Sequence, residues 1–123
     1  MLLELTAETL EASEASVPTL AVACDVDPDE VPRNVEALAI EFPAFNDGRG
    51  LSLAVLLRRR GFDGRLVAVG ETHPELYHYL YRCGFCAVEA TSNYDLTAAR
   101  AAYRPHLLHY QADARGTLPV YRR

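Results

Sequence analysis

The chain has 123 residues, half of them apolar and 24% charged, and its formal net charge is −5 at pH 7. This length suits a single domain over residues 1–123, and the composition excludes a disordered chain. The negative charge excludes nucleic acid as an electrostatic partner, and the lack of a basic secretory start or an apolar run of about 20 residues predicts a cytoplasmic protein without a membrane segment.

The first third of the chain predicts one strand and one short helix after an acidic, alanine-rich start. Residues 6–18 have the composition of a short helix or a loose connector, so we expect residues 1–18 to be loosely attached. Residues 19–24 are apolar and lie between a proline and an aspartate, as expected for a buried strand. An aspartate and a proline then supply an N-cap and a first-turn residue, which predicts a helix over about 28–36.

The middle of the chain predicts two further pairs of a strand and a helix. The strand 37–42 precedes a helix over about 51–60, which Gly61 ends. The strand 65–69 precedes a helix over 73–82, whose start combines capping-box spacing with a proline in the first turn. Both pairs have the order of a strand followed by a crossover to a parallel neighbour.

A fourth strand is expected over 85–90 and a fourth helix over about 92–103, followed by an irregular tail, 106–123. Four successive βα units imply an α/β fold with a mostly parallel sheet, either a flavodoxin-like open sheet or a half (β/α) barrel. In both architectures the functional loops follow the carboxyl ends of the strands. Here these loops are 25–28, 43–50, 70–73 and 90–93.

The loop after the strand 37–42 is the longest of the four and carries the chemistry of an anion site. Gly48 and Gly50 allow positive φ and a close approach to a ligand, and the N–H groups that open the next helix favour an anion. Arg49 adds a charge-assisted contact and Ser52 a hydroxyl. Asp47 repels a bare anion, so we expect it to orient Arg49 or to cap the helix. A plain Asp-Gly turn at a helix start explains the same residues equally well.

Common nucleotide and hydrolase motifs are missing from this loop. A Walker loop needs Gly-Lys-Ser/Thr, and a dinucleotide fingerprint needs a third glycine. A nucleophile elbow needs a tight turn between strand and helix, whereas about eight residues separate them here. The sequence therefore identifies no catalytic residue and no cofactor.

The segment 83–86 is a CxxC pair, which in a cytoplasmic protein suggests a dithiol redox pair. Its position at the C-terminus of the helix 73–82 disfavours a thiolate, because the helix dipole is negative there. Structural cysteines explain the pair better. A zinc site would need further ligands, which His73 and His78 are poorly spaced to supply, so we predict no metal site.

The helix 73–82 carries Tyr77, Tyr79 and Tyr81 on several faces. One interpretation is a surface for a partner or for a homodimer, since tyrosine combines a large contact area with a polar tip. The other is an ordinary amphipathic helix with half-buried tyrosines.

Several blocks of the chain, over about residues 19–123, resemble the signature of the bacterial DUF934 family. The most specific are the Asp47–Ser52 loop, with the pattern DGRG-x-S, and the second motif Arg82, Cys83 and Gly84. The resemblance implies an oxidoreductase or accessory protein associated with assimilatory sulfite reduction. The remaining matching blocks are Ala37–Glu41, Phe42-Pro43, Phe45, Ala54, Leu57-Arg58, Gly61, Gly64, Ala68-Val69-Gly70, Phe85, Tyr110-Gln111 and Arg122-Arg123.

Three positions depart from the family pattern. Val67 stands where an arginine is common, the loop Gly70–Glu75 lacks the usual aspartate, and Cys86 replaces a typical aspartate. If that arginine and aspartate bind the family's ligand, the specificity of this member has changed. We expect an accessory protein of sulfite reduction, in sulfur metabolism, that binds a small anion at Asp47–Ser52. The alternative is a non-catalytic module that docks on sulfite reductase or forms a homodimer through the helix 73–82.

Overall fold

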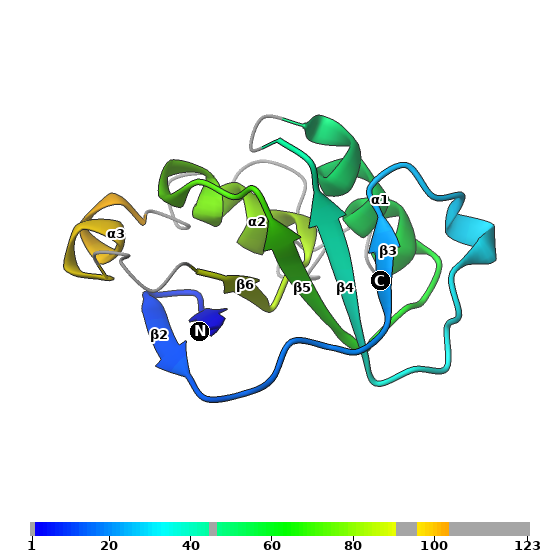
Figure 1. Ribbon diagram of the computed structural model, residues 1–123, viewed down its shortest axis with the longest axis horizontal. Coiled ribbons are helices and arrows are strands. Elements are labelled where there is room, and N and C mark those ends of the chain that lie inside the picture. The colour runs from blue at the N-terminus through cyan, green and yellow to red at the C-terminus, as the bar shows by residue number, and fades with distance from the viewer. Residues whose placement is uncertain (1, 45–46, 91–95, 104–123) are drawn as a thin grey trace.

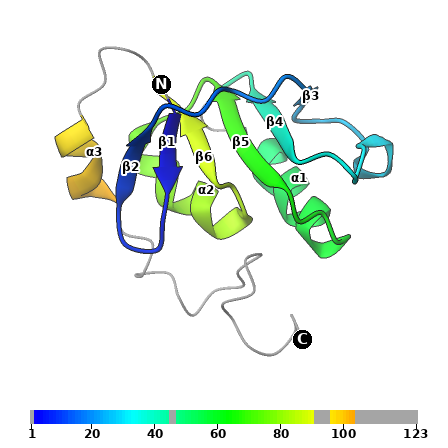
Figure 2. The ribbon, with the colours of Figure 1, turned by 90° about the horizontal axis from the view of Figure 1, so that it is seen from below.

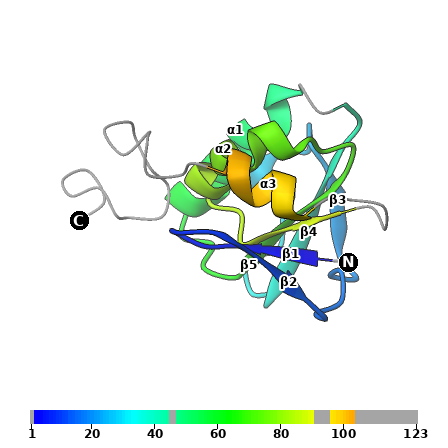
Figure 3. The same cartoon turned by 90° about the vertical axis from the view of Figure 1, so that its left-hand side faces the viewer.

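The computed structural model describes residues 2–44, 47–90 and 96–103, which form an open six-stranded sheet with helices on one face (Figures 1 and 3). The strands are β1 (Leu2–Leu5), β2 (Leu10–Ser13), β3 (Ala21–Ala23), β4 (Ala37–Phe42), β5 (Arg65–Gly70) and β6 (Ala87–Glu89). The α-helices are α1 (Gly48–Arg59), α2 (Tyr77–Cys83) and α3 (Leu96–Ala102), with short 3-10 helices η1 (Pro28–Glu30) and η2 (Pro74–Leu76). The fold is therefore mixed α/β. No helix of the described residues is long and apolar enough to cross a membrane.

The strands β3 to β6 form the parallel part of the sheet and lie side by side in chain order. Their register places Val22 beside Ile40, Ile40 beside Ala68, and Ala68 beside Val88. A doubly wound sheet of the flavodoxin type has a reversal of strand order, at which its ligand binds. The parallel strands described here show no such reversal, so the predicted flavodoxin-like fold is not confirmed. Their carboxyl ends nevertheless lie together at one edge of the sheet.

Residues 2–13 form a β-hairpin, so the expectation of a helix over 6–18 is wrong, and residues 10–13 are part of the sheet rather than a loose connector. β1 pairs antiparallel with both β2 and β6, which makes the sheet mixed rather than a series of four βα units. Leu3 lies opposite Val88, and Leu5 lies opposite Leu10. Strands this short depend on tertiary pairing rather than on local preference, and the free edge of β6 supplies that pairing.

The helix α3 fastens this hairpin to the rest of the domain. The Arg100 Nε donates a hydrogen bond to the Leu10 carbonyl at 2.8 Å, and the Tyr103 hydroxyl donates to the Thr6 carbonyl at 2.8 Å. Tyr103 itself is buried. The predicted start of this helix, near residue 92, and the tail 106–123 lie outside the described residues.

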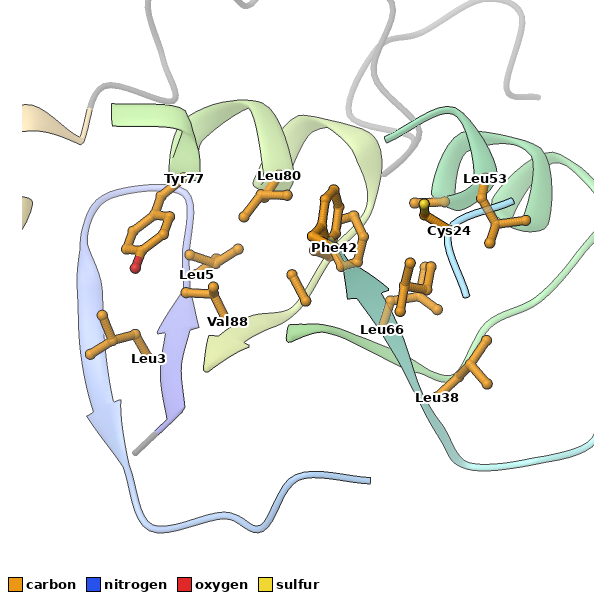
Figure 4. Packing of buried hydrophobic residues seen from close by; sticks show 14 of the residues in the cluster. Leu3, Leu5, Cys24, Leu38, Phe42, Leu53, Leu66, Tyr77, Leu80 and Val88 are labelled. Carbon is orange, nitrogen blue, oxygen red and sulfur yellow. The ribbon is translucent and has the colours of Figure 1, made fainter. Parts of the chain in front are cut away.

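The main core lies between the sheet and the helices, where apolar side chains of alternate strand residues meet α1 and α2 (Figure 4). Phe42 and Phe85 form its centre, with ring centroids 5.8 Å apart. Cys24 and Leu53 close it at the β3 side. Other buried members are Leu3, Leu5, Leu38, Ile40, Leu57, Leu66, Tyr77, Leu80 and Val88.

The other face of the sheet carries a smaller buried cluster without helices over it. The strands β2 and β3 are the two outer strands, so the segment 14–20 that joins them crosses the sheet from edge to edge (Figure 2). Beside the cluster, Arg65 of β5 and Glu4 of β1 form a two-pronged ion pair at 2.8 and 2.9 Å. This pair joins the hairpin to the parallel strands. The clustered residues are Leu2, Ala39, Val67, Val69 and Ala87.

Two predicted helices differ from the observed ones. The helix expected over 28–36 is only the single turn η1, because Val31 precedes a proline and takes an extended conformation, with ψ of 130°. The helix expected over 51–60 begins earlier, at Gly48, since Asp47 rather than a later residue is the N-cap. The loop before α1 is therefore shorter than the sequence suggested.

Candidate functional site

The candidate site lies where the carboxyl ends of β3 and β4 meet the start of α1. Cys24 and Asp25 follow β3, and Asp47 directly precedes α1. β3 and β4 are neighbours in the parallel sheet, which brings Cys24 and Asp47 together although 23 residues separate them. The loop 43–50 is thus joined at this edge by the loop 25–28, as expected for successive parallel strands.

Asp47 caps α1 and orients Arg49, so both of its expected roles are present. Its carboxylate accepts a hydrogen bond from the Arg49 backbone N–H at 3.0 Å. The same carboxylate accepts from the Arg49 guanidinium, from Nε at 3.0 Å and from Nη2 at 2.6 Å. These hydrogen bonds hold the pKa of Asp47 well below its usual range and raise the pKa of Arg49. Both side chains are therefore charged at neutral pH.

The third guanidinium nitrogen of Arg49 faces Asp25. Its Nη1 lies 3.7 Å from the Asp25 Oδ2, and the two side chains are 59% and 62% exposed. This separation exceeds hydrogen-bond distance, and exposed ion pairs contribute little to stability. A ligand oxygen can therefore bind to Nη1 with a smaller loss of existing interactions than at Nε or Nη2.

Cys24 is the buried member of the cluster, with 5% of its surface exposed. Its thiol donates a hydrogen bond to the Asp47 Oδ2 at 3.7 Å. Burial is the main cause that raises the pKa of this thiol, and Asp47 raises it further, while Arg49 acts in the opposite sense. At neutral pH Cys24 is therefore a thiol that donates to Asp47 rather than a nucleophilic thiolate.

The two glycines of the motif do not have the positive φ that was predicted for them. Both lie in the first turn of α1. A Cβ on Gly50 would lie 2.4 Å from the Phe42 ring, whereas a Cβ on Gly48 would meet no atom within 4 Å. Gly50 therefore lets α1 pack closely on β4, which is a structural reason for glycine. Among the described residues, positive φ occurs at Gly61, Gly70 and Gly84.

Two open depressions adjoin the guanidinium of Arg49. The larger, of about 590 Å³, runs between the loop after β3 and the exposed side of α1, past Ser52 and Leu53. The smaller, of about 300 Å³, extends over Phe42 and Pro43. Cys24, Asp25 and Arg49 line both of them. The predicted residues Asp47, Gly48, Arg49 and Ser52 thus gather at one edge, with Gly50 packed behind them.

The second predicted motif lies apart from this site and ends α2. Gly84 is the C-cap, with a φ of 109°, and the Phe85 N–H donates to the Leu80 carbonyl at 3.0 Å. Arg82 is buried at 5% exposure, and Cys83 packs against the main core. This arrangement is that of a helix end.

Arg58 packs against Gly84, where a Cβ would lie 2.8 Å from the Arg58 Cγ, and the sequence interpretation missed this contact. Arg58 lies in the last turn of α1, where an arginine is usually part of a solvated face, but here it is partly buried. Its guanidinium donates to the carbonyls of Phe62, Gly64 and Gly84, at 3.0, 2.7 and 2.6 Å. It also lies 3.6 Å from the Cys86 sulfur. The sequence feature that could have predicted this role is the position of Arg58 next to Leu57, at the border of the buried face of α1.

The helix with three tyrosines presents a smaller surface than the sequence suggested. Tyr77 is buried, Tyr81 is half-buried, and Tyr79 is 41% exposed. The ring of His78 lies against that of Tyr79, with centroids 4.3 Å apart. The helix start also differs from the predicted capping box, since His73 caps η2, with its Nδ1 accepting from the Glu75 N–H at 3.2 Å.

The three cysteines are free thiols, and the described residues contain no cluster of three or more side chains suited to a metal ion. Cys24 and Asp25 are the site residues that sequence reasoning did not single out, although the loop 25–28 had been selected by its place after a strand. The Phe45 and Asn46 positions of the motif loop lie outside the described residues.

Comparison with known proteins gives one match. The model of the DUF934 family, described as a bacterial protein of unknown function, matches residues 19–121. This range includes β3 to β6, both motifs and the candidate site. No curated protein and no solved structure matches the chain.

Proposed function

The chain belongs to the DUF934 family, and from this premise we propose that it is an accessory protein of assimilatory sulfite reduction that binds a small anion at Arg49. The association with sulfite reduction comes from the family resemblance described above. The observation that carries the anion site is the exposed guanidinium of Arg49, held in place by Asp47 beside the first turn of α1. A fixed guanidinium binds sulfur and phosphorus oxyanions well, because its planar donors match their oxygens.

The charges around Arg49 define how such an anion would bind. The Nε and Nη2 donors are occupied by Asp47, so the anion would accept from Nη1 and displace Asp25. Asp25 opposes this binding through its negative charge. At about 4 Å in water, one unit charge contributes about 1 kcal/mol. Removing the charge of Asp25 should therefore tighten anion binding about fivefold.

Isothermal titration with sulfite, sulfate and a nucleoside triphosphate tests the site. Saturable binding of one of these anions is expected, with loss of binding in Arg49→Ala and about fivefold tighter binding in Asp25→Asn. Arg33→Ala is the matched control, since it removes an exposed arginine that does not line either depression. The proposal fails if none of the anions binds, or if Arg49→Ala binds as the unaltered protein does.

The physiological part of the proposal needs a separate test. Deletion of the gene from a bacterium that carries it should impair growth on sulfate or sulfite as the only sulfur source, and leave growth on cysteine unchanged. Equal growth of the deletion strain on all three sources would contradict a role in sulfite reduction while leaving the anion site untouched.

A second candidate function is docking on sulfite reductase or on another copy of the chain through α2. The observation in its favour is Tyr79, which is 41% exposed and stacked on His78. Sedimentation of the isolated protein and co-purification with the reductase test it, and Tyr79→Ser should weaken the association. A monomer that retains no reductase would rule out this function.

A further inference from the structure

The depression beside Arg49 is much larger than an inorganic oxyanion. Its volume of about 590 Å³ lies in the range of pockets for organic ligands, about 300 to 1,000 Å³. A sulfite ion has only four heavy atoms, and a water molecule takes up about 30 Å³ of liquid volume. An ion bound at Arg49 would thus leave most of this depression filled with water.

The depression has a polar end and an apolar end. Arg49, Ser52 and Leu56 follow one another along the exposed side of α1, at spacings of three and four residues that place them on one face. The step from residue 49 to residue 56 is about 10 Å along the helix, at 1.5 Å per residue. The lining therefore changes from a guanidinium and a hydroxyl to aliphatic carbon over the length of a short alkyl chain.

The apolar end is built from side chains of both walls. Val26 and Pro28 come from the loop after β3, and Leu53 and Leu56 come from α1. Leu53 is buried, next to Cys24 (Figure 4), whereas Leu56 is 39% exposed and is one of the few large apolar side chains on the described surface. Covering Leu56 would remove apolar surface from water, which favours a ligand with an apolar part.

We propose that the ligand of this site is an organic anion, with its acidic group on Arg49 and an aliphatic part along Val26, Leu53 and Leu56. This inference rests on the proposed anion binding at Arg49 and adds the chemical class of the ligand. A sulfonate is the form of such a ligand that shares its head group with sulfite and sulfate.

A cationic ligand is the main alternative to an anion at this site. Asp25 and Glu41 also line the depressions, so the two carboxylates could attract an alkylammonium instead of an anion. Asp47 is already occupied by Arg49. The test must therefore include a cation of the same length.

Binding of sulfate, ethanesulfonate, butanesulfonate and hexanesulfonate, measured by titration calorimetry, tests the inference. Affinity should rise from ethanesulfonate to hexanesulfonate, by about two- to fourfold for each methylene, where fourfold corresponds to complete burial. Leu56→Ala should reduce the gain with chain length and leave the affinity for sulfate unchanged. Val17→Ala is the control, since Val17 is as exposed as Leu56 but does not line the depression.

The possible results separate this inference from the proposed function. Equal affinity for ethanesulfonate and hexanesulfonate would overturn the inference and leave the anion site standing. Tighter binding of hexylammonium than of hexanesulfonate would overturn it as well, and would show that the carboxylates select the ligand. Lack of binding of every anion would overturn both proposals, whereas a rise with chain length that disappears in Arg49→Ala would support both.

Discussion

Replacement of Arg58 by alanine should strongly destabilise the protein, because this side chain joins three segments of the fold. The guanidinium donates four hydrogen bonds to three backbone carbonyls, those of Phe62, Gly64 and Gly84. It thereby joins the end of α1, the start of β5 and the end of α2. In Arg58→Ala these carbonyls lose a charged donor, and the partly buried setting restricts their access to water.

The expected loss follows from the strength of such hydrogen bonds. Each hydrogen bond to a charged group contributes about 1.5 to 3 kcal/mol, but water replaces part of it where Arg58 is not fully buried. We therefore expect a decrease of about 3 kcal/mol in the free energy of unfolding, less than the sum of the separate hydrogen bonds. A domain of this kind is stable by about 5 to 15 kcal/mol in total, so the loss would be large.

Urea unfolding followed by circular dichroism measures this decrease. Arg58→Lys should recover only part of the stability, because an ammonium group cannot reach three carbonyls in the geometry of a guanidinium. Arg33→Ala is the control, since its hydrogen bond to the Arg60 carbonyl is exposed and 3.4 Å long, and should cost less than about 1 kcal/mol. An Arg58→Ala protein as stable as Arg33→Ala would refute the structural role assigned to this residue.

Two further predictions concern the motif glycines and the helix α2. Gly50→Ala should lower the free energy of unfolding by about 1 to 3 kcal/mol, because the added Cβ clashes with Phe42. Gly48→Ala has open space at its Cβ and should raise the free energy of unfolding by about 0.5 kcal/mol. Equal effects of the two substitutions in thermal unfolding would contradict the packing role of Gly50. Burial and then the charge of Arg82 lower the pKa of His78 below 6.5, so the unfolded chain binds the proton more readily and stability should fall as the pH drops through about 6.5. His78→Gln should show a smaller decrease between about pH 7.5 and 5.5 in urea unfolding, and an unchanged decrease would assign it to other groups.

Much of the parallel part of the fold could be predicted from local sequence. The apolar runs at β4 and β5 are bounded by turn residues, and their observed limits agree with the expected ones to within one residue. The predicted start of α1, at about residue 51, was later than the observed start at Gly48, because the glycines after Asp47 suggested a loop. An aspartate N-cap followed by a helix describes the same residues. The hairpin of β1 and β2 could not be predicted, because four-residue strands take their structure from the neighbour that they pair with.

The sequence alone determined that Asp47 and Arg49 stand after a buried strand and before a helix, since capping preference and apolar runs act over a few neighbouring residues. The sequence alone also identified the two family motifs, Asp47–Ser52 and Arg82–Gly84. Only the tertiary structure decided which side chains these motifs contact. The parallel pairing of β3 with β4 brings Cys24 and Asp25 to Arg49, and the packing of α1 on β4 places Gly50 against the Phe42 ring. Such contacts join segments far apart in the chain, and local preference carries no information about them.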